Sequence, residues 1–337
     1  MYDFLGICLA LAALLIVNAI ASVLTAAFWG FVSRFTKNWS GATRARIIFV
    51  LQTFPATAAL LLVGVFLVPS YLAFEPRQTS ETVGVKLGLL ALFSVIGIAL
   101  ALWRGIAAWL ATKRLVDDWK THSETITVEN LPVPAYRISH QFPVVAVVGV
   151  LRPRLFVANQ IFDSLNDDEM AAVIAHETAH VASRDNLKHW LMRICRDVLV
   201  IVPSNRLLDK EWAEAIELAA DEQAASGKKN ATALDLAQAL IKIARLIPKG
   251  LKPTMPAGVF LIGGEAESAN GLTKRITRLM EMSGEKIFNK NWKKLLASGF
   301  TWICFGLLIF AVVLTATNSG VLATMHAVIE RIVSALS

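Results

Sequence analysis

The chain has 337 residues, of which 55% are hydrophobic, with a positive mean hydropathy and a formal charge of +7 at pH 7. This composition is too apolar for a soluble protein of ordinary domains and fits a chain that crosses a membrane several times. The positive charge does not indicate nucleic-acid binding, because no zinc-knuckle, helix-turn-helix or aromatic-basic strand pattern accompanies it.

Four long apolar segments account for the composition. Only Arg104 is charged within them, and each reaches the roughly 20 residues that a helix needs to cross a bilayer. The first segment is too long for a cleaved signal and follows Asp3 instead of a basic start. We therefore predict four transmembrane helices, at about residues 4–33, 47–74, 87–112 and 295–317.

Lysines and arginines in short loops mark the cytoplasmic side of a membrane protein. They are concentrated between residues 34 and 46, directly after residue 112, and directly before residue 295. We therefore expect a multi-pass protein of the bacterial inner membrane with its N-terminus outside. The chain has three cysteines, two of them inside apolar segments, so no disulfide framework is expected.

The polar residues 113–292 are predicted to form one cytoplasmic domain, between a membrane part at 1–112 and a last helix with a short tail at 293–337. Its first part shows strand patterns, and its second part shows helix signals that begin with Asn166 as a cap and Glu169 three positions on. Strands are predicted at about 125–128, 143–148 and 154–157, helices at about 167–183, 185–201, 207–226, 230–246 and 272–282, and a loop rich in proline and glycine at 248–270.

His176, Glu177 and His180 form an HExxH sequence late in the predicted helix 167–183. Residues four apart on a helix lie one turn above each other, so two imidazoles can bind one metal ion. Glu177 can then act as the general base that takes a proton from the attacking water and delivers it to the departing amine. This pattern predicts a zinc site, with one Zn²⁺ per chain.

Hydrolytic zinc sites commonly have three protein ligands, so a third donor is required. Glu211, Glu214 and Glu217 are candidates on one predicted helix. We favour Glu217, because Asp221 follows it at i+4 and can accept the far ring N–H of a ligating histidine. Glu214 is the next choice.

Other polar residues have simpler interpretations. His189 could donate a proton near the oxyanion, although a core or solvated histidine is the commoner case. Asp185 could orient a ligand or pair with Arg184 at the helix end. Arg193 and Arg206 are candidates for stabilising an oxyanion, and Cys195 has no histidine partner that would make it a nucleophile. A peptide substrate could add as a strand beside the predicted strand residues Val145, Ala146, Val147 and Val148.

The residues Gly149 to Val157, Leu165 to Glu169, Ala172 to His180 and Arg184–Asp185, with Glu217 and Asp221, resemble the membrane metallopeptidases of the beta-lactam sensor/antirepressor family. The resemblance implies His176, His180 and Glu217 as zinc ligands, Glu177 as catalytic acid/base and Asp221 as an orienting carboxylate. It implies a mostly α membrane protein, with four transmembrane helices and an inserted α+β gluzincin metalloprotease domain that contains a small sheet.

Sensor members of that family carry an extracytoplasmic penicillin-binding domain after the last helix and cleave a cytoplasmic repressor. Only about 20 residues follow position 317 here, so we expect no such domain and no beta-lactam sensing. Regulatory proteolysis, such as cleavage of a transcriptional repressor, is the expected function. Two alternatives are a CAAX-prenyl/heat-shock-type protease in protein quality control and a non-catalytic membrane adaptor with structural zinc. The expected partners are the lipid bilayer and a protein or peptide substrate.

Overall fold

The computed structural model describes residues 2–36, 39–77, 83–128, 131–198, 205–226, 231–247, 269–284, 315 and 318–336. These residues are mostly helical, with one small sheet. Apart from residue 315, the predicted fourth transmembrane helix at 295–317 lies outside the described residues, as does most of the predicted loop at 248–270.

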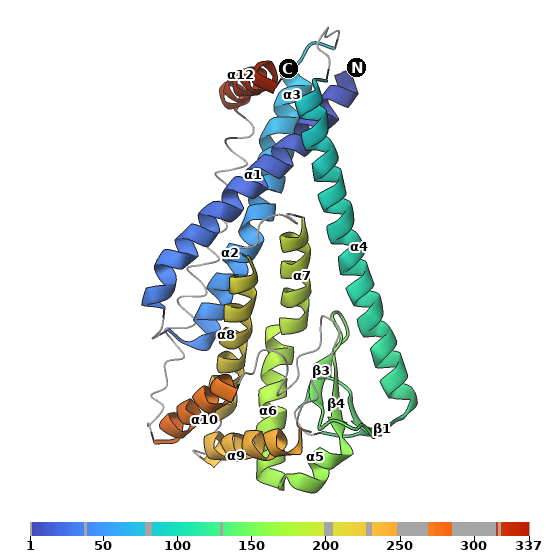
Figure 1. Ribbon diagram of the computed structural model, residues 1–337, viewed down its shortest axis with the longest axis vertical. Coiled ribbons are helices and arrows are strands. Elements are labelled where there is room, and N and C mark those ends of the chain that lie inside the picture. Colours follow the sequence, from blue (N-terminus) through green and yellow to red (C-terminus); the bar gives the residue numbers. More distant parts are fainter. Residues whose placement is uncertain are drawn as a thin grey trace.

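Three helices in the described part are long and apolar enough to cross a membrane. The first is α1 (Tyr2–Val32) with its one-turn extension η1 (Ser33–Phe35). The second runs without interruption from Gly41 to Phe74 through α2 (Gly41–Leu61), the π-helical segment η2 (Leu62–Leu67) and α3 (Val68–Phe74). The third is α4 (Val85–Thr121). They contain the first three predicted spans (Figure 1).

The outward faces of these helices are apolar. Large side chains such as Phe31, Leu72 and Trp103 are each about two-thirds exposed. A contiguous apolar surface of this kind is unfavourable in water and is typical of a surface that faces lipid. Polar side chains of α1, including Asn18 and Ser22, are buried.

The sheet has four strands in the order β1-β2-β4-β3, and β2 was not predicted from the sequence. Strand β2 (Ala135–Ile138) pairs antiparallel with β1 (Ser123–Ile126) and parallel with β4 (Arg154–Ala158), while β3 (Val145–Val148) pairs antiparallel with β4. The sheet is therefore mixed, and the predicted strand at 125–128 lies two residues earlier than expected. In the described residues β3 is an edge strand.

The helices after the sheet lie close to their predicted positions. A short α5 (Asn159–Ser164) precedes α6 (Asp167–Ser183), whose capping box between Asn166 and Glu169 is confirmed. The helix predicted at 185–201 is described as far as Asp197, and the next helix begins two residues earlier than predicted. These later helices are α7 (Asp185–Asp197), α8 (Asn205–Ala225), α9 (Ala231–Leu246) and α10 (Ala269–Gly284).

Helices α7 and α8 pack directly against the membrane helices. A Cβ atom at Gly105 of α4 would lie 2.8 Å from the Ile194 side chain of α7, and one at Gly41 of α2 would lie 2.4 Å from the Ala219 backbone of α8. The indole of Trp190 donates a hydrogen bond to the Gly105 carbonyl at 2.9 Å. The helices that frame the HExxH helix are thus held in place by α2 and α4. The division at residues 112 and 292 stays a prediction.

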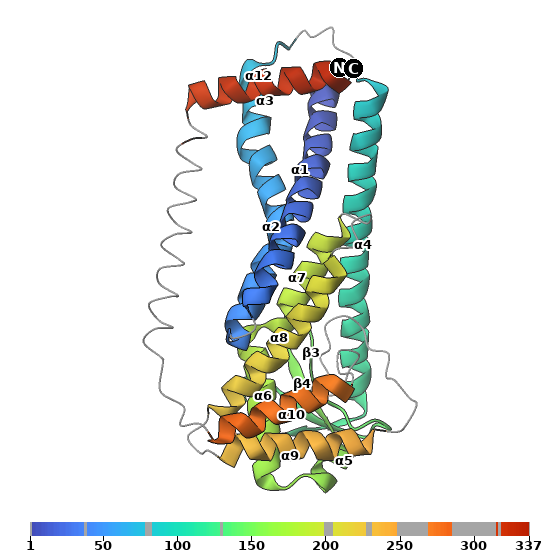
Figure 2. The same cartoon turned by 60° about the vertical axis from the view of Figure 1, so that its left-hand side comes forward.

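Helix α12 (Ser319–Leu336) lies across the ends of the membrane helices that are farthest from the sheet (Figure 2). It contacts α3, where the Ser70 hydroxyl donates to the Leu322 carbonyl at 2.7 Å. His326 stacks on Phe74, with ring centroids 5.9 Å apart.

Candidate functional site

The HExxH helix α6 presents both histidines in the protein interior. His176 and Glu177 are almost fully buried, and His180 is 5% exposed. Helix α6 ends at Ser183, the next residue Arg184 has a left-handed φ of 54°, and α7 begins at Asp185. This single turn residue brings Asp185 back against the HExxH helix.

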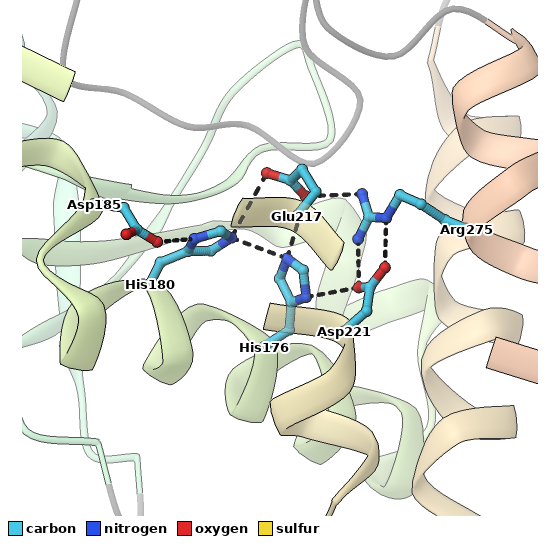
Figure 3. Close-up of polar contacts among 6 residues, drawn as sticks. All are labelled: His176, His180, Asp185, Glu217, Asp221 and Arg275. Carbon is cyan, nitrogen blue, oxygen red and sulfur yellow. Dashed lines mark hydrogen bonds and ion pairs between the residues drawn. The ribbon is translucent and has the colours of Figure 1, made fainter. Parts of the chain in front are cut away.

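Three donor groups converge at the centre of the site (Figure 3). The two Nε2 atoms of His176 and His180 are 3.2 Å apart. A carboxylate oxygen of Glu217, from α8, lies 3.5 Å from Nε2 of His176, and the other lies 3.7 Å from Nε2 of His180. Tetrahedral zinc with nitrogen and oxygen ligands spaces its donors at roughly 3.3–3.5 Å. The donor set therefore fits a zinc ion.

Each histidine has its own carboxylate partner on the far ring nitrogen. Nδ1 of His176 lies 3.0 Å from Asp221 on α8, and Nδ1 of His180 lies 2.8 Å from Asp185 on α7. A carboxylate at Nδ1 fixes the tautomer that directs Nε2 toward a metal. Asp185, for which the sequence left two interpretations open, is thus placed beside a histidine of the HExxH pair.

A buried arginine that the sequence analysis missed completes the charged part of the site. Arg275 of α10 is 7% exposed and lies 2.9 Å from Glu217. Its Nε and one terminal nitrogen donate to the two oxygens of Asp221 at 2.8 and 2.7 Å. Such a two-point pair fixes both position and orientation. No local spacing pattern joins α10 to the HExxH helix, so only the tertiary structure reveals this residue.

The electrostatics of the cluster follow from these contacts. Burial alone would raise the pKa of Glu217, but Arg275 and the two histidines outweigh it and lower this pKa to about 2. Burial likewise opposes the charged form of His176, yet the carboxylates of Asp221 and Glu217 raise its pKa to about 10. The pocket thus favours negative carboxylates facing a positive charge at its centre.

Glu177 occupies a different environment, on the side of α6 that faces the sheet. Burial raises the pKa of its carboxyl, which accepts a hydrogen bond from the Val147 N–H of β3. Within the described residues, its Oε2 atom is buried and has no hydrogen-bond partner. A buried carboxylate oxygen in this state is costly unless another group, such as a water molecule, approaches it.

The alternative candidates do not join the donor cluster in the described part of the chain. Glu211 pairs with Arg44 of α2 at 2.6 Å, and Glu214 contributes no atom to the cluster. His189 packs on Trp212, with ring centroids 5.6 Å apart. Burial, followed by Arg193 and then Arg196, lowers the pKa of His189 to about 3, which keeps its ring neutral. The side chain of Arg206 lies outside the described residues, and Cys195 is half-buried with a raised pKa caused by burial.

The predicted substrate strand corresponds to β3, and its four residues are buried. Asn186, the second residue of α7, donates its side-chain amide to the carbonyls of Val147 at 2.9 Å and Gly149 at 3.0 Å. A pocket of about 360 Å³ opens beside this contact, between β3, the turn after it, and α7. His180 and Asp185 also line this pocket, so it leads to the donor cluster.

The apolar helices, the HExxH helix and the donor cluster beside Glu177 define the chain as a membrane protease. Residues 72–277 match the family described as BlaR1 peptidase M56, and the chain belongs to this family. The matched region includes all six residues of Figure 3. The resemblance noted in the sequence is thereby confirmed.

The chain is also similar to a protein named Protease HtpX homolog from Janthinobacterium sp. (strain Marseille). The two are 31% identical over 127 residues, which covers 33% of this chain and 44% of that protein. The chain thus spans less than half of the length of this relative.

Proposed function

We propose that this chain is a zinc-dependent endopeptidase that is embedded in the membrane by several helices and cleaves polypeptides at a cytoplasmic site. The observation that carries the proposal is the convergence of His176, His180 and Glu217 beside the buried carboxylate of Glu177. Zinc, when bound there, would polarise the scissile carbonyl and activate water.

The protein groups around the donors have separate tasks. Asp221 and Asp185 hold the two imidazoles with their Nε2 atoms toward the centre, and Arg275 holds Glu217 in place. Glu177 takes a proton from the attacking water and passes it to the leaving amine, for which a raised carboxyl pKa is suited. A structural zinc site would have no use for a buried glutamate in this position, which argues against a non-catalytic adaptor.

We further propose that a substrate peptide aligns along β3. The backbone of Val147 faces the site, because its N–H reaches Glu177 and its carbonyl reaches Asn186. A peptide N–H that pairs with Val147 would compete with the Asn186 amide for this carbonyl. Strand addition of this type aligns a peptide by backbone hydrogen bonds and leaves side chains to set specificity.

The packing of α7 on α4 supports a substrate that lies near the membrane. Asp185, which contacts His180, opens the same helix whose Trp190 binds the Gly105 carbonyl of α4. The site is thereby joined to a helix that is long and apolar enough to cross the bilayer. Regulatory proteolysis, such as cleavage of a repressor, is the function we favour from the family. Protein quality control, the alternative left open by the sequence, is the second candidate.

The test compares the wild type with Glu177→Gln and with Glu214→Gln, a change at a partly exposed glutamate of α8 that lies outside the cluster. Loss of the general base should lower kcat/KM by about 10²–10⁴-fold with metal content unchanged, and Glu214→Gln should have little effect. Peptide termini mapped in cells then identify the substrates. Cleaved repressors support the regulatory function, and fragments of membrane proteins support quality control. Equal cleavage by wild type and Glu177→Gln would refute the hydrolase proposal.

A further inference from the structure

A second pocket, also of about 360 Å³, lies on the other side of the turn that borders the active-site pocket. It is formed between the end of α4 and the turn that joins β3 to β4. Gly149, Val150 and Leu151 line both pockets, whereas this one adds Trp109 and Lys113 of α4 together with Arg152 and Arg154 of the turn and β4. Its volume is within the roughly 300–1,000 Å³ that is usual for small-molecule sites.

The charged groups of this pocket are predominantly basic. Lys113, Arg152 and Arg154 face one acid, Asp117. None of the three cations forms an ion pair with any residue that the structure describes. The rest of the lining is largely apolar. Unpaired cations above an apolar wall are suited to a ligand that has an anionic head and an apolar body.

The turn that carries the arginines has a fixed shape. Gly149 has a φ of 118°, and a Cβ there would lie only 2.6 Å from the Arg152 carbonyl oxygen. A residue other than glycine would strain this turn. The Gly149 carbonyl is held in addition by Asn186. The turn that presents Arg152 and leads into Arg154 is therefore stabilised by a hydrogen bond from Asn186, which lies on its active-site side.

The position of the pocket along α4 corresponds to the lipid headgroups. From Lys86 to Lys113 the helix rises about 40 Å, close to the 40–45 Å of a bilayer with its headgroup regions. Trp109, one turn before Lys113, is of the type that gathers at the membrane interface. Leu151 is 68% exposed beside it. With α4 crossing the membrane, this pocket opens at the surface of the leaflet that adjoins the peptidase domain.

We propose that this pocket binds the headgroup of an anionic phospholipid. The lipid phosphate lies among Lys113, Arg152 and Arg154, and the apolar wall with Trp109 and Leu151 receives the glycerol and the start of the acyl chains. The inference rests on α4 crossing the membrane and does not require peptidase activity. Its consequence is that a lipid occupies one side of the turn whose other side lines the active-site pocket.

The test measures lipid binding by native mass spectrometry of the full chain with Glu177→Gln, to which phosphatidylglycerol or phosphatidylethanolamine is added in detergent. Phosphatidylglycerol should bind to the chain at least several-fold more tightly than phosphatidylethanolamine does. Lys113→Gln, Arg152→Gln and Arg154→Gln should each weaken its binding about fivefold, as expected for one basic residue near an anionic lipid. Unchanged zinc content and unfolding temperature verify that each variant is folded.

Arg114→Gln is the matched control, because Arg114 follows Lys113 on α4, is exposed, and does not line the pocket. It should leave the affinity for phosphatidylglycerol unchanged. An equal loss in this variant would show general attraction to the basic surface and overturn the proposal. Competition by inorganic phosphate at the same concentration as the lipid would also overturn it, because the site would then bind soluble anions.

Discussion

The two flanks of the donor cluster are built in different ways. On the α8 and α10 flank, Glu217, Asp221 and Arg275 form a buried ionic network. On the β3 and α7 flank, Asn186 forms neutral hydrogen bonds to backbone carbonyls beside a pocket. Buried ion pairs are costly to break, whereas a neutral amide exchanges more easily for another donor. From this comparison we propose that the first flank holds the metal donors and the second receives the substrate.

The largest effect is expected on the charged flank. Arg275→Met leaves two buried carboxylates without their cation and should lower the free energy of unfolding of the metal-free protein by about 3–5 kcal/mol. Arg278→Met is the control, since Arg278 pairs with Glu222 at 2.7 Å nearer the surface and should cost only about 0–1 kcal/mol. Denaturant unfolding in the presence of a chelator measures both. If both variants lost the same free energy of unfolding, the buried network of Arg275 would be no more stabilising than the surface pair of Arg278.

A smaller effect is expected when the orienting carboxylates are neutralised. Asp221→Asn and Asp185→Asn should each weaken zinc binding about 10–100-fold, because the imidazole loses the partner that fixes its tautomer. Competition with a chelator of known affinity measures this. The control Glu222→Gln changes the carboxylate next to Asp221 and should leave the affinity unchanged. If Asp221→Asn also leaves it unchanged, the contact at His176 has no role in metal binding.

Substitutions on the β3 and α7 flank are expected to change the KM for a peptide substrate. Asn186→Ala should lower the free energy of unfolding by about 1–3 kcal/mol and also lower the KM for a peptide substrate, because it frees the carbonyls of β3. The matched control is Gln160→Ala, which removes an amide that bridges the carbonyls of His140 and Gln141 away from the site. It should lower stability and leave KM unchanged. A higher KM for Asn186→Ala would mean that this amide holds β3 in shape for substrate and does not compete with it.

The smallest effect is expected at Glu169, a charged residue that lies outside both flanks of the donor cluster. Burial would raise the pKa of Glu169, but Lys242 and the Asn166 N–H outweigh it and lower this pKa. Ionised Glu169 therefore adds stability above the ordinary pKa of glutamate, and this contribution is lost as the pH falls through the lowered value. Lys242 is partly exposed, so Glu169→Gln should cost about 1 kcal/mol at pH 7. Unfolding curves of variant and wild type should converge in acid, and a constant difference at every pH would contradict this.

The parts of the fold that were predicted correctly rest on local patterns. The start of α6 follows from Asn166 and Glu169, three positions apart, and both contacts of the capping box are present. The geometry of Glu217 and Asp221 follows from their i+4 spacing on one helix. A helix repeats its geometry every few residues, so sequence spacing determines which side chains share a face.

The missed features depend on contacts between distant segments. Strand β2 is only four residues long, and its parallel partner β4 comes after an intervening strand, so no local pattern indicates that pairing. Arg275 lies 54 positions after Asp221, and Asn186 lies 39 positions after Val147. The contact of α8 with α2 pairs a site helix with a membrane helix across more than 150 residues. Such contacts follow from tertiary packing and leave no periodic pattern.

The junction at Arg184 has a mechanical consequence. One residue separates α6 from α7, so the connection is too short for the two helices to shift independently of each other. Gly105 of α4 packs against Ile194 of α7, and Gly97 of α4 packs against Val198, the residue after α7. The contact of α7 with α4 and this one-residue junction therefore connect the position of α4 to the Asp185–His180 contact. A single turn residue thus joins the helix that packs on α4 to the helix that carries both histidines of the donor cluster.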